Sequence, residues 1–189
     1  MASTISTTQK KDNEKDFLRF MAKLIFIWLS WKLIIFVLGI ESKPIDTRLF
    51  PALSRQWENL NNEVRWIILD GSEIVLNKMG YATNNNGYIL NIENEIGIGM
   101  GNYCIGFQLM YYFIMLVIIA RFNWWRTILY SVAGVFITIF INVFRVAGLC
   151  WLVVYKPEYM AISHDYIFNA VVLGVLMVFY YFLVRKNTN

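Results

Sequence analysis

The chain has 189 residues, of which 58% are hydrophobic and 16% are charged, and its formal net charge is +4. An ordinary soluble domain carries about 25% charged residues, so this composition excludes a disordered protein and argues against a soluble domain. Two cysteines and one histidine are too few for a disulfide framework or a structural zinc site. The sequence contains neither a nucleic-acid-binding module nor a phosphate-binding loop. Most of the chain is therefore expected to lie in a lipid bilayer.

Four apolar segments are predicted to be transmembrane helices, which need roughly 20 apolar residues each. The first has no small-residue cleavage site after it, so we interpret it as a retained signal anchor. Lys32 lies near its middle and either snorkels to the headgroups or faces a cavity. The sequence thus predicts one all-α membrane domain, with a polar tail at residues 1–16 and spans at residues 17–40, 104–120, 127–155 and 164–184.

Clusters of basic residues predict the orientation of these spans. Basic residues precede the first span, occur in the link at residues 121–126 and follow the fourth span. Four crossings put these clusters on one side, whereas residues 41–103 on the other side contain eight acids and five bases. The positive-inside rule then predicts that both termini are cytoplasmic. Residues 41–103 and the loop at residues 156–163 are expected to face outward.

The outer segment is predicted to be folded. Asn84–Gly87 is typical of a turn, and residues 88–92 and 95–99 predict a small hairpin. Glycines 97, 99 and 101 allow the backbone to approach closely before the second span. One or two amphipathic helices, on the outer leaflet or capping the bundle, are predicted by apolar residues at helical spacing: Trp57, Leu60, Val64, Ile67, Ile68, Ile74 and Val75.

Three reactive side chains are predicted at one depth of the membrane. Cys104 begins the second span and His164 begins the fourth, and both spans run inward. Arg145 lies 18 residues after Thr127 on a span that runs outward, which is about 27 Å of helix. All three residues should therefore lie near the outer boundary, where a helical bundle can bring them together.

Each of the three residues alone has a structural explanation: a buried thiol, a helix-capping imidazole and a snorkelling guanidinium. Together they favour chemistry. A free thiol is mostly protonated at neutral pH and needs a nearby cation to ionise, which Arg145 supplies, while His164 supplies a base and an acid. No acid lies within residues 104–120, 127–155 or 166–184, and an arginine in a span is a functional hypothesis by default. The set suits nucleophilic acyl transfer.

Three neighbouring residues each have more than one interpretation. Cys150 also lies toward the outer side, so a disulfide with Cys104 is conceivable; however, it is about 140° from Arg145 around the helix, and we interpret it as packing. Asn142 shares a face with Arg145 and either orients it, donates to an oxyanion or makes a helix contact. Asp165 either balances Arg145 and fixes the imidazole of His164 or is a solvated acid at a helix N-terminus.

The residues Gly101–Phe107, Asn142–Val146 and His164–Asp165 resemble the exosortase/archaeosortase family of membrane transpeptidases. The shared pattern is a Cys before an apolar helix, Asn-x-x-Arg in the next helix and His-Asp opening another. The match covers over a third of the chain and is similar to compact, Bacteroidetes-type bacterial members. The chain departs from the pattern at Ile105, where many members have Ser or Gly.

The resemblance implies a protein-sorting cysteine transpeptidase with Cys104, Arg145 and His164 as catalytic residues and Asn142 and Asp165 in support. Its substrates would be membrane-anchored proteins with a C-terminal motif, a transmembrane helix and a basic tail. The enzyme would lie in the bacterial cytoplasmic (inner) membrane and cut near the outer face of that membrane through a thioacyl intermediate. Neither a metal nor an organic cofactor is implied, and the partners are lipid and protein but not nucleic acid. The rival functions are a membrane thiol oxidoreductase and a non-enzymatic membrane scaffold.

Overall fold

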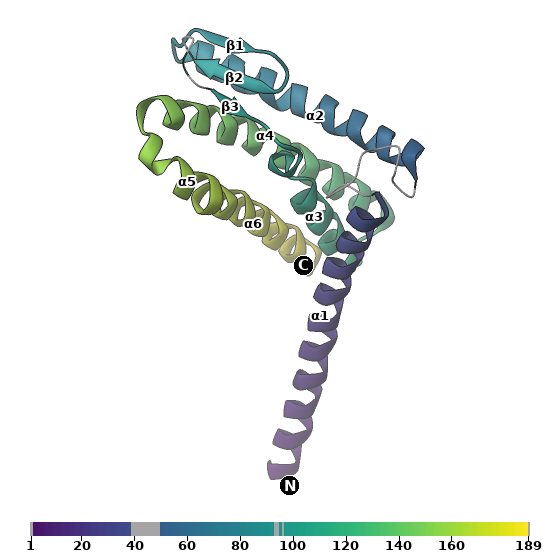
Figure 1. The fold of residues 1–189 in the computed structure, drawn as a ribbon. Helices are drawn as coiled ribbons and strands as arrows, with labels where there is room; N and C mark the ends of the chain where they lie inside the picture. Colours follow the sequence, from purple (N-terminus) through teal and green to yellow (C-terminus); the bar gives the residue numbers. More distant parts are fainter. Residues whose placement is uncertain (1, 39–49, 93–94, 96, 189) are drawn as a thin grey trace. The chain divides into compact units, whose positions relative to one another are not determined.

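The computed structural model describes residues 2–38, 50–92, 95 and 97–188, which belong to two compact units, Met1–Ser54 and Arg55–Asn189. The first unit is dominated by α1 (Ala2–Leu38) (Figure 1). The predicted polar tail is helical and continuous with the first predicted span, whose residues Met21–Leu38 are long and apolar enough to cross a membrane. Ser54 Oγ donates a hydrogen bond of 2.7 Å to the carbonyl of Leu38.

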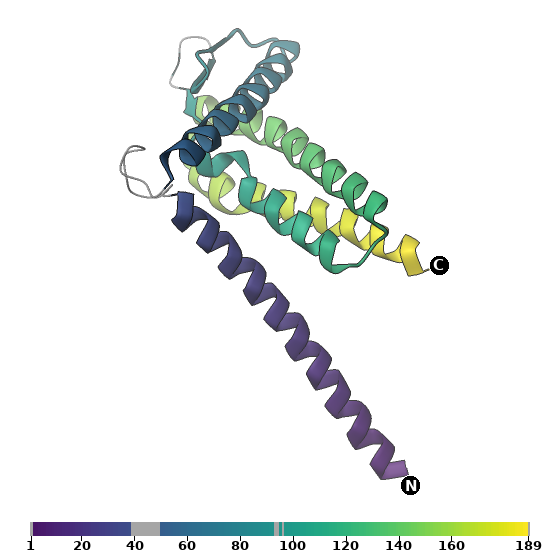
Figure 2. The ribbon, with the colours of Figure 1, turned by 90° about the vertical axis from the view of Figure 1, so that its right-hand side faces the viewer.

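The second unit is mostly helical and carries a small sheet, as the sequence predicts. Figures 1 and 2 show α3, α4 and α6 side by side, with the strands near the C-terminal half of α4. The elements in chain order are α2 (Pro51–Lys78), β1 (Thr83–Asn85), β2 (Ile89–Ile92), β3 (Ile98–Gly99), η2 (Asn102–Ile105), α3 (Phe107–Ile119), α4 (Trp124–Tyr155), η3 (Pro157–Tyr159), α5 (Met160–Ile162), η4 (Ser163–Ile167) and α6 (Phe168–Thr188).

Two helices of this unit are long and apolar enough to span a bilayer, Trp124–Tyr155 and Phe168–Arg185. With α1 they make three such helices in the described part of the chain. The second predicted span is shorter than expected, because α3 has 13 residues, or about 20 Å of helix. Its helix cannot extend back to Cys104, since Gly106 has φ +86° and ends the preceding turn.

The sheet confirms the predicted hairpin and adds a strand to it. β2 pairs antiparallel with β3, with Ile89 opposite Gly99. The predicted turn lies about two residues later than expected, because Asn84 and Asn85 belong to β1 and pair with β2. Gly87, with φ +84°, supplies the backbone conformation for the reversal.

Close approach is required at one of the three predicted glycines. A Cβ on Gly97 would overlap the carbonyl oxygen of Leu90 and the side chain of Asn91, whereas Gly99 and Gly101 have room for one. Gly97 therefore allows the chain to return closely across β2.

Two apolar clusters hold the second unit together. One joins α2, the sheet and the C-terminal half of α4, and includes Ile68, Leu90 and Val146. The other joins α3, α4 and α6, and includes Phe113 and Val172. The site described below lies in the two turns that precede α3 and α6, where the chain leaves the first cluster.

The predicted amphipathic segment is one helix, α2, and its predicted apolar residues are divided between two sides. Leu60, Ile67 and Ile74 are exposed, whereas Ile68 is buried. Polar groups on the buried side find partners: Ser72 Oγ donates to the carbonyl of Val143 at 2.9 Å. A count of apolar residues cannot detect such a face, which comprises Ser54, Asn61, Arg65, Ile68, Leu69, Ser72 and Leu76.

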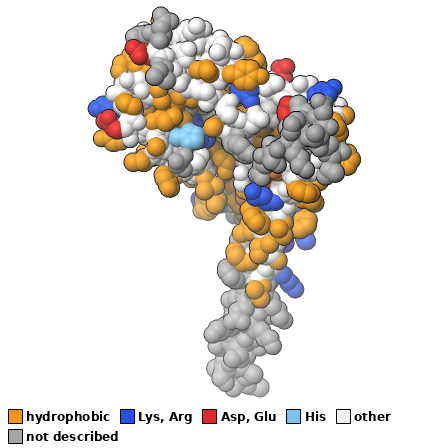
Figure 3. Space-filling model, viewed as in Figure 1, with side chains coloured by type: hydrophobic (Ala, Val, Ile, Leu, Met, Phe, Trp, Pro, Cys, Tyr) orange, Lys and Arg blue, Asp and Glu red, His pale blue; other side chains and the backbone are white. Residues whose placement is uncertain are grey.

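Apolar side chains also cover much of the outside of the protein (Figure 3). On α4 the exposed residues include Phe136 and Phe140, and on α6 they include Met177 and Val178. An exterior of this kind suits contact with lipid, where burial of apolar side chains needs no protein partner.

Candidate active site

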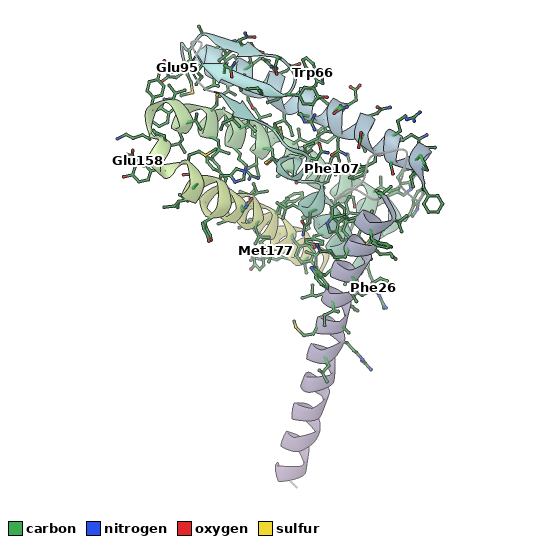
Figure 4. All side chains as sticks on the ribbon, viewed as in Figure 1. Phe26, Trp66, Glu95, Phe107, Glu158 and Met177 are labelled. Atoms are coloured by element: carbon green, nitrogen blue, oxygen red, sulfur yellow. The ribbon has the colours of Figure 1, made fainter. Side chains whose placement is uncertain are left out.

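Cys104 lies in a short 3-10 helix, η2, between two glycines. Its backbone N–H donates to the carbonyl of Gly101 at 3.0 Å, and its side chain is half-buried. Gly106 follows in the left-handed region, and α3 then begins at Phe107, labelled in Figure 4. Phe107 packs against Trp57 of α2, with ring centroids 4.8 Å apart. The thiol is therefore held in a turn above α3.

Gly106 satisfies two requirements of this turn. Its φ of +86° is one that residues with a Cβ rarely adopt. A Cβ there would also lie 2.7 Å from Nδ2 of Asn142 and 3.3 Å from Cγ2 of Thr138. Glycine at this position lets the turn approach α4 closely enough for a hydrogen bond.

That hydrogen bond belongs to Asn142, one of the predicted supporting residues. Asn142 is buried, and its Nδ2 donates to the carbonyl oxygen of Ile105 at 2.8 Å. Ile105, where the chain departs from the family pattern, is itself fully buried. The observed partner of Asn142 thus lies next to Cys104, which favours a role in holding the turn of the thiol.

His164 lies in a π-helical turn, η4, between α5 and α6. Turns of this type are rare and frequently occur at functional sites. The structure brings the imidazole to the thiol, because Nε2 of His164 is 3.5 Å from Sγ of Cys104. The histidine is half-buried, and the pale blue side chain of Figure 3 shows that it reaches the surface. A thiol and an imidazole at this distance, open to solvent, can exchange a proton.

Arg145 is linked to the same turn from α4. Its side chain is buried, with 6% of its surface exposed, and NH2 donates to the backbone carbonyl of His164 at 3.4 Å. The structure therefore joins the three predicted residues in a chain of contacts from Cys104 through His164 to Arg145. The permanent charge of the guanidinium is brought to the backbone that carries the imidazole.

The remaining predicted residues lie outside this group. Cys150 and Cys104 are both free thiols, and Cys150 is buried with Sγ 3.2 Å from the carbonyl of Leu90. This arrangement agrees with the packing role that we predicted for Cys150. The side chain of Asp165 lies outside the described residues, and Lys32 belongs to the first unit. Within the described ranges, no three His, Cys, Asp or Glu side chains gather as a metal-binding group.

The structure adds two residues that the sequence did not single out, Arg65 and Asn102. Arg65 is charged, yet only 5% of its surface is exposed. It donates from NH2 to Oδ1 of Asn102, the first residue of the turn that holds Cys104. The signal available in the sequence was the helical spacing of Asn61, Arg65 and Ser72, which places them on one face of α2.

Comparison with known proteins identifies the family of the chain. No curated protein and no solved structure gives a significant match. The family model described as transmembrane exosortase (Exosortase_EpsH) matches residues 19–183, which include every element that contributes to the site. The chain therefore belongs to the transmembrane exosortase family.

Proposed function

We propose that this membrane protein is a cysteine transpeptidase that cleaves a C-terminal sorting signal at the outer face of the cytoplasmic membrane. The observation that carries the proposal is the distance of 3.5 Å between Sγ of Cys104 and Nε2 of His164. A nucleophile and a base within reach of each other, with the base linked to a third group, is the arrangement that activates a thiol. The contact between Arg145 and the carbonyl of His164 supplies that third group.

In the proposed reaction, His164 accepts the thiol proton and the sulfur of Cys104 attacks the scissile carbonyl carbon. The C–S bond forms, the amide C–N bond breaks, and His164 returns the proton to the leaving amine. An acceptor amine then attacks the thioester, the C–S bond breaks, and the acceptor loses a proton to His164. Water in place of the amine would give hydrolysis by the same steps.

Arg145 is proposed to stabilise negative charge during these steps. A guanidinium remains charged at all working pH values, and in a partly dry site its charge acts more strongly than in water. The side chain of Arg145 is buried, with 6% of its surface exposed, so water screens the charge less than it would at an exposed position. This charge favours both the thiolate and the oxyanion that follows.

The substrate proposed is a membrane-anchored protein that ends in a short motif, a transmembrane helix and a basic tail. The half-buried thiol at the top of α3 is suited to a peptide bond presented where such a helix leaves the membrane. The proposed orientation has both termini in the cytoplasm, which gives the site access to the outer face.

The test is co-expression with a tagged substrate of this class, followed by detection of the cleaved form. Wild-type protein should release the C-terminal helix, and Cys104→Ala should leave the substrate intact at the same expression level. Addition of hydroxylamine should release a substrate fragment from the wild-type protein, because hydroxylamine cleaves thioesters. Cleavage by Cys104→Ala at the wild-type level would refute the proposal.

A further inference from the structure

Arg65 is a buried cation beside the turn that carries Cys104. The helix α2 places it on the face that packs toward α4 and the sheet, where 5% of its surface is exposed. NH1 donates to Oδ1 of Asn62 at 3.0 Å, and NH2 donates to Oδ1 of Asn102. The guanidinium carbon lies 4.8 Å from the centre of the Tyr88 ring.

These partners are all neutral. Among the described residues no carboxylate pairs with Arg65, and its buried Nε has no hydrogen-bond partner there. Burial of a charge with neutral partners costs free energy, and a hydrophobic side chain of similar length would pack in the same place without that cost. Stability therefore does not explain this arginine.

Its position in the fold points to another explanation. Asn102 is the first residue of η2 and Ile105 is the last. Arg65 on α2 holds the side chain of Asn102, while Asn142 on α4 holds the carbonyl of Ile105. The short helix that contains Cys104 is thus held at both ends by buried donors from different helices. A 3-10 helix of four residues has few hydrogen bonds of its own to fix its direction.

We propose that Arg65 is a positioning residue that fixes the turn of Cys104 so that its sulfur meets His164. The proposal rests on the proposed function of Cys104 as the nucleophile. The planar guanidinium is suited to this task, since its fork binds two acceptors at once and holds Asn102 in line with Asn62. A displacement of the sulfur by about 1 Å is enough to lower turnover by roughly 100-fold.

The test compares three variants of the full chain in detergent, all in a Cys150→Ala background so that Cys104 is the single thiol. Arg65→Met removes the fork, and Arg65→Lys keeps the charge without the fork. The matched control is Arg55→Met, which removes an exposed arginine from the same helix. One readout is the pH profile of alkylation of Cys104 by N-ethylmaleimide, and the second is kcat and KM for cleavage of the tagged substrate.

We expect Arg65→Met and Arg65→Lys to alkylate on the order of tenfold more slowly than the background at neutral pH and to recover at high pH, as a thiol without its imidazole would. Turnover should fall through kcat by roughly 100-fold, with KM unchanged, and Arg55→Met should match the background. Profiles that superimpose on the background would overturn the proposal. A raised KM with unchanged kcat would also overturn it, and would assign Arg65 to substrate binding.

A fourth variant guards against loss of the fold. Asn102→Asp keeps an oxygen for the guanidinium and adds an ion pair. Cys104 should therefore be alkylated at the background rate in Asn102→Asp when Arg65 is present. The rate should fall when Asn102→Asp is combined with Arg65→Met. If Cys104 is alkylated at the same rate in Asn102→Asp and in Asn102→Asp with Arg65→Met, the positioning role of Arg65 is refuted. Because alkylation requires no substrate, it tests the positioning role of Arg65 even where cleavage by Cys104→Ala has refuted the proposed function.

Discussion

The sulfur of Cys104 and Nε2 of His164 lie 3.5 Å apart although 60 residues separate them in the chain. Each residue stands in a turn immediately before an apolar helix, Cys104 before α3 and His164 before α6. The packing of α3 and α6 in one apolar cluster brings the two turns together. The bundle thereby pairs a thiol with an imidazole at the ends of these two helices.

The first prediction separates the two cysteines. Cys104→Ser should reduce substrate cleavage by at least a hundredfold, because a hydroxyl is ionised far less readily than a thiol beside the same imidazole. Cys150→Ala should retain cleavage, since its sulfur is buried against the carbonyl of Leu90. Cleavage in cells, normalised to protein level by immunoblot, measures both variants. Loss of activity in Cys150→Ala at full expression would show that Cys150 does more than pack.

The second prediction concerns the guanidinium of Arg145. Arg145→Lys should lower kcat severely, by about two orders of magnitude, because an ammonium cannot supply the fork of donors that reaches the carbonyl of His164. The measurement is single-turnover cleavage in detergent. A turnover near that of the wild type would reduce Arg145 to a point charge.

The alkylation rate of Cys104 gives an independent check on Arg145. In a folded Arg145→Ala variant, the rate should fall at neutral pH and recover at high pH, because a cation near the thiol favours its ionised form. The background is Cys150→Ala in both proteins. Identical profiles would leave Arg145 without an electrostatic effect on the thiol.

The third prediction tests orientation. Asn84 is exposed in β1, within the segment that the positive-inside rule places outside. In a variant whose native cysteines are both replaced by Ala, Asn84→Cys should react with a membrane-impermeant maleimide in whole cells. A cysteine introduced at Arg121, in the link between α3 and α4, should react only after the cells are opened. The reverse pattern would invert the orientation and remove the site from the outer face.

The candidate catalytic residues could be found from the sequence because few chemical groups interrupt the apolar spans. Cys104, Arg145 and His164 stand out from their surroundings, and helix length alone predicts a common depth for them. The contact between Cys104 and His164 bears out that reasoning in geometry. The same scarcity of chemical groups made Cys150 a competitor of Cys104. Its angle of about 140° from Arg145 around the helix favoured a packing role instead.

The sequence did not predict the burial pattern of α2, where apolar side chains are exposed and polar side chains are buried. On α2 the apolar residues Leu60 and Ile67 are exposed and the charged Arg65 is buried. In water such a pattern would be unfavourable, but beside a membrane apolar side chains can face lipid. Periodicity reports only that apolar residues share a face; it does not report which side of the helix the protein occupies. The pattern of apolar residues therefore gave no signal that Arg65 is buried.

The local breaks in the helices could not be predicted from the sequence either. An apolar run reads as one helix from Cys104 onward, yet the chain turns at Gly106 before α3 begins. The π-helical turn around His164, which lies between α5 and α6, was likewise not predicted from the sequence. Both breaks place a reactive residue outside regular helix, where its side chain is free to approach another element.

The fourth prediction concerns the contact of Gly106 with Asn142. Gly106→Ala should lower the free energy of unfolding through two effects: the left-handed conformation at φ +86°, which costs a residue with a Cβ about 1–2 kcal/mol, and crowding of the new methyl against Nδ2 of Asn142, which costs about 1–3 kcal/mol. Gly80→Ala isolates the first effect, because Gly80 has φ +93° and nothing within 4 Å of a Cβ.

A double-mutant cycle isolates the second effect. Asn142→Ala alone leaves the buried carbonyl of Ile105 without its 2.8 Å donor, at a cost of about 1–3 kcal/mol. In the double variant the new methyl fills space that the amide occupied, so its cost should be smaller than the two single costs added, by about 1 kcal/mol or more. Reversible unfolding in detergent measures all four proteins. Strict additivity would mean that the turn moves away from α4 in Gly106→Ala, and Cys104 alkylation should then slow in that variant as well.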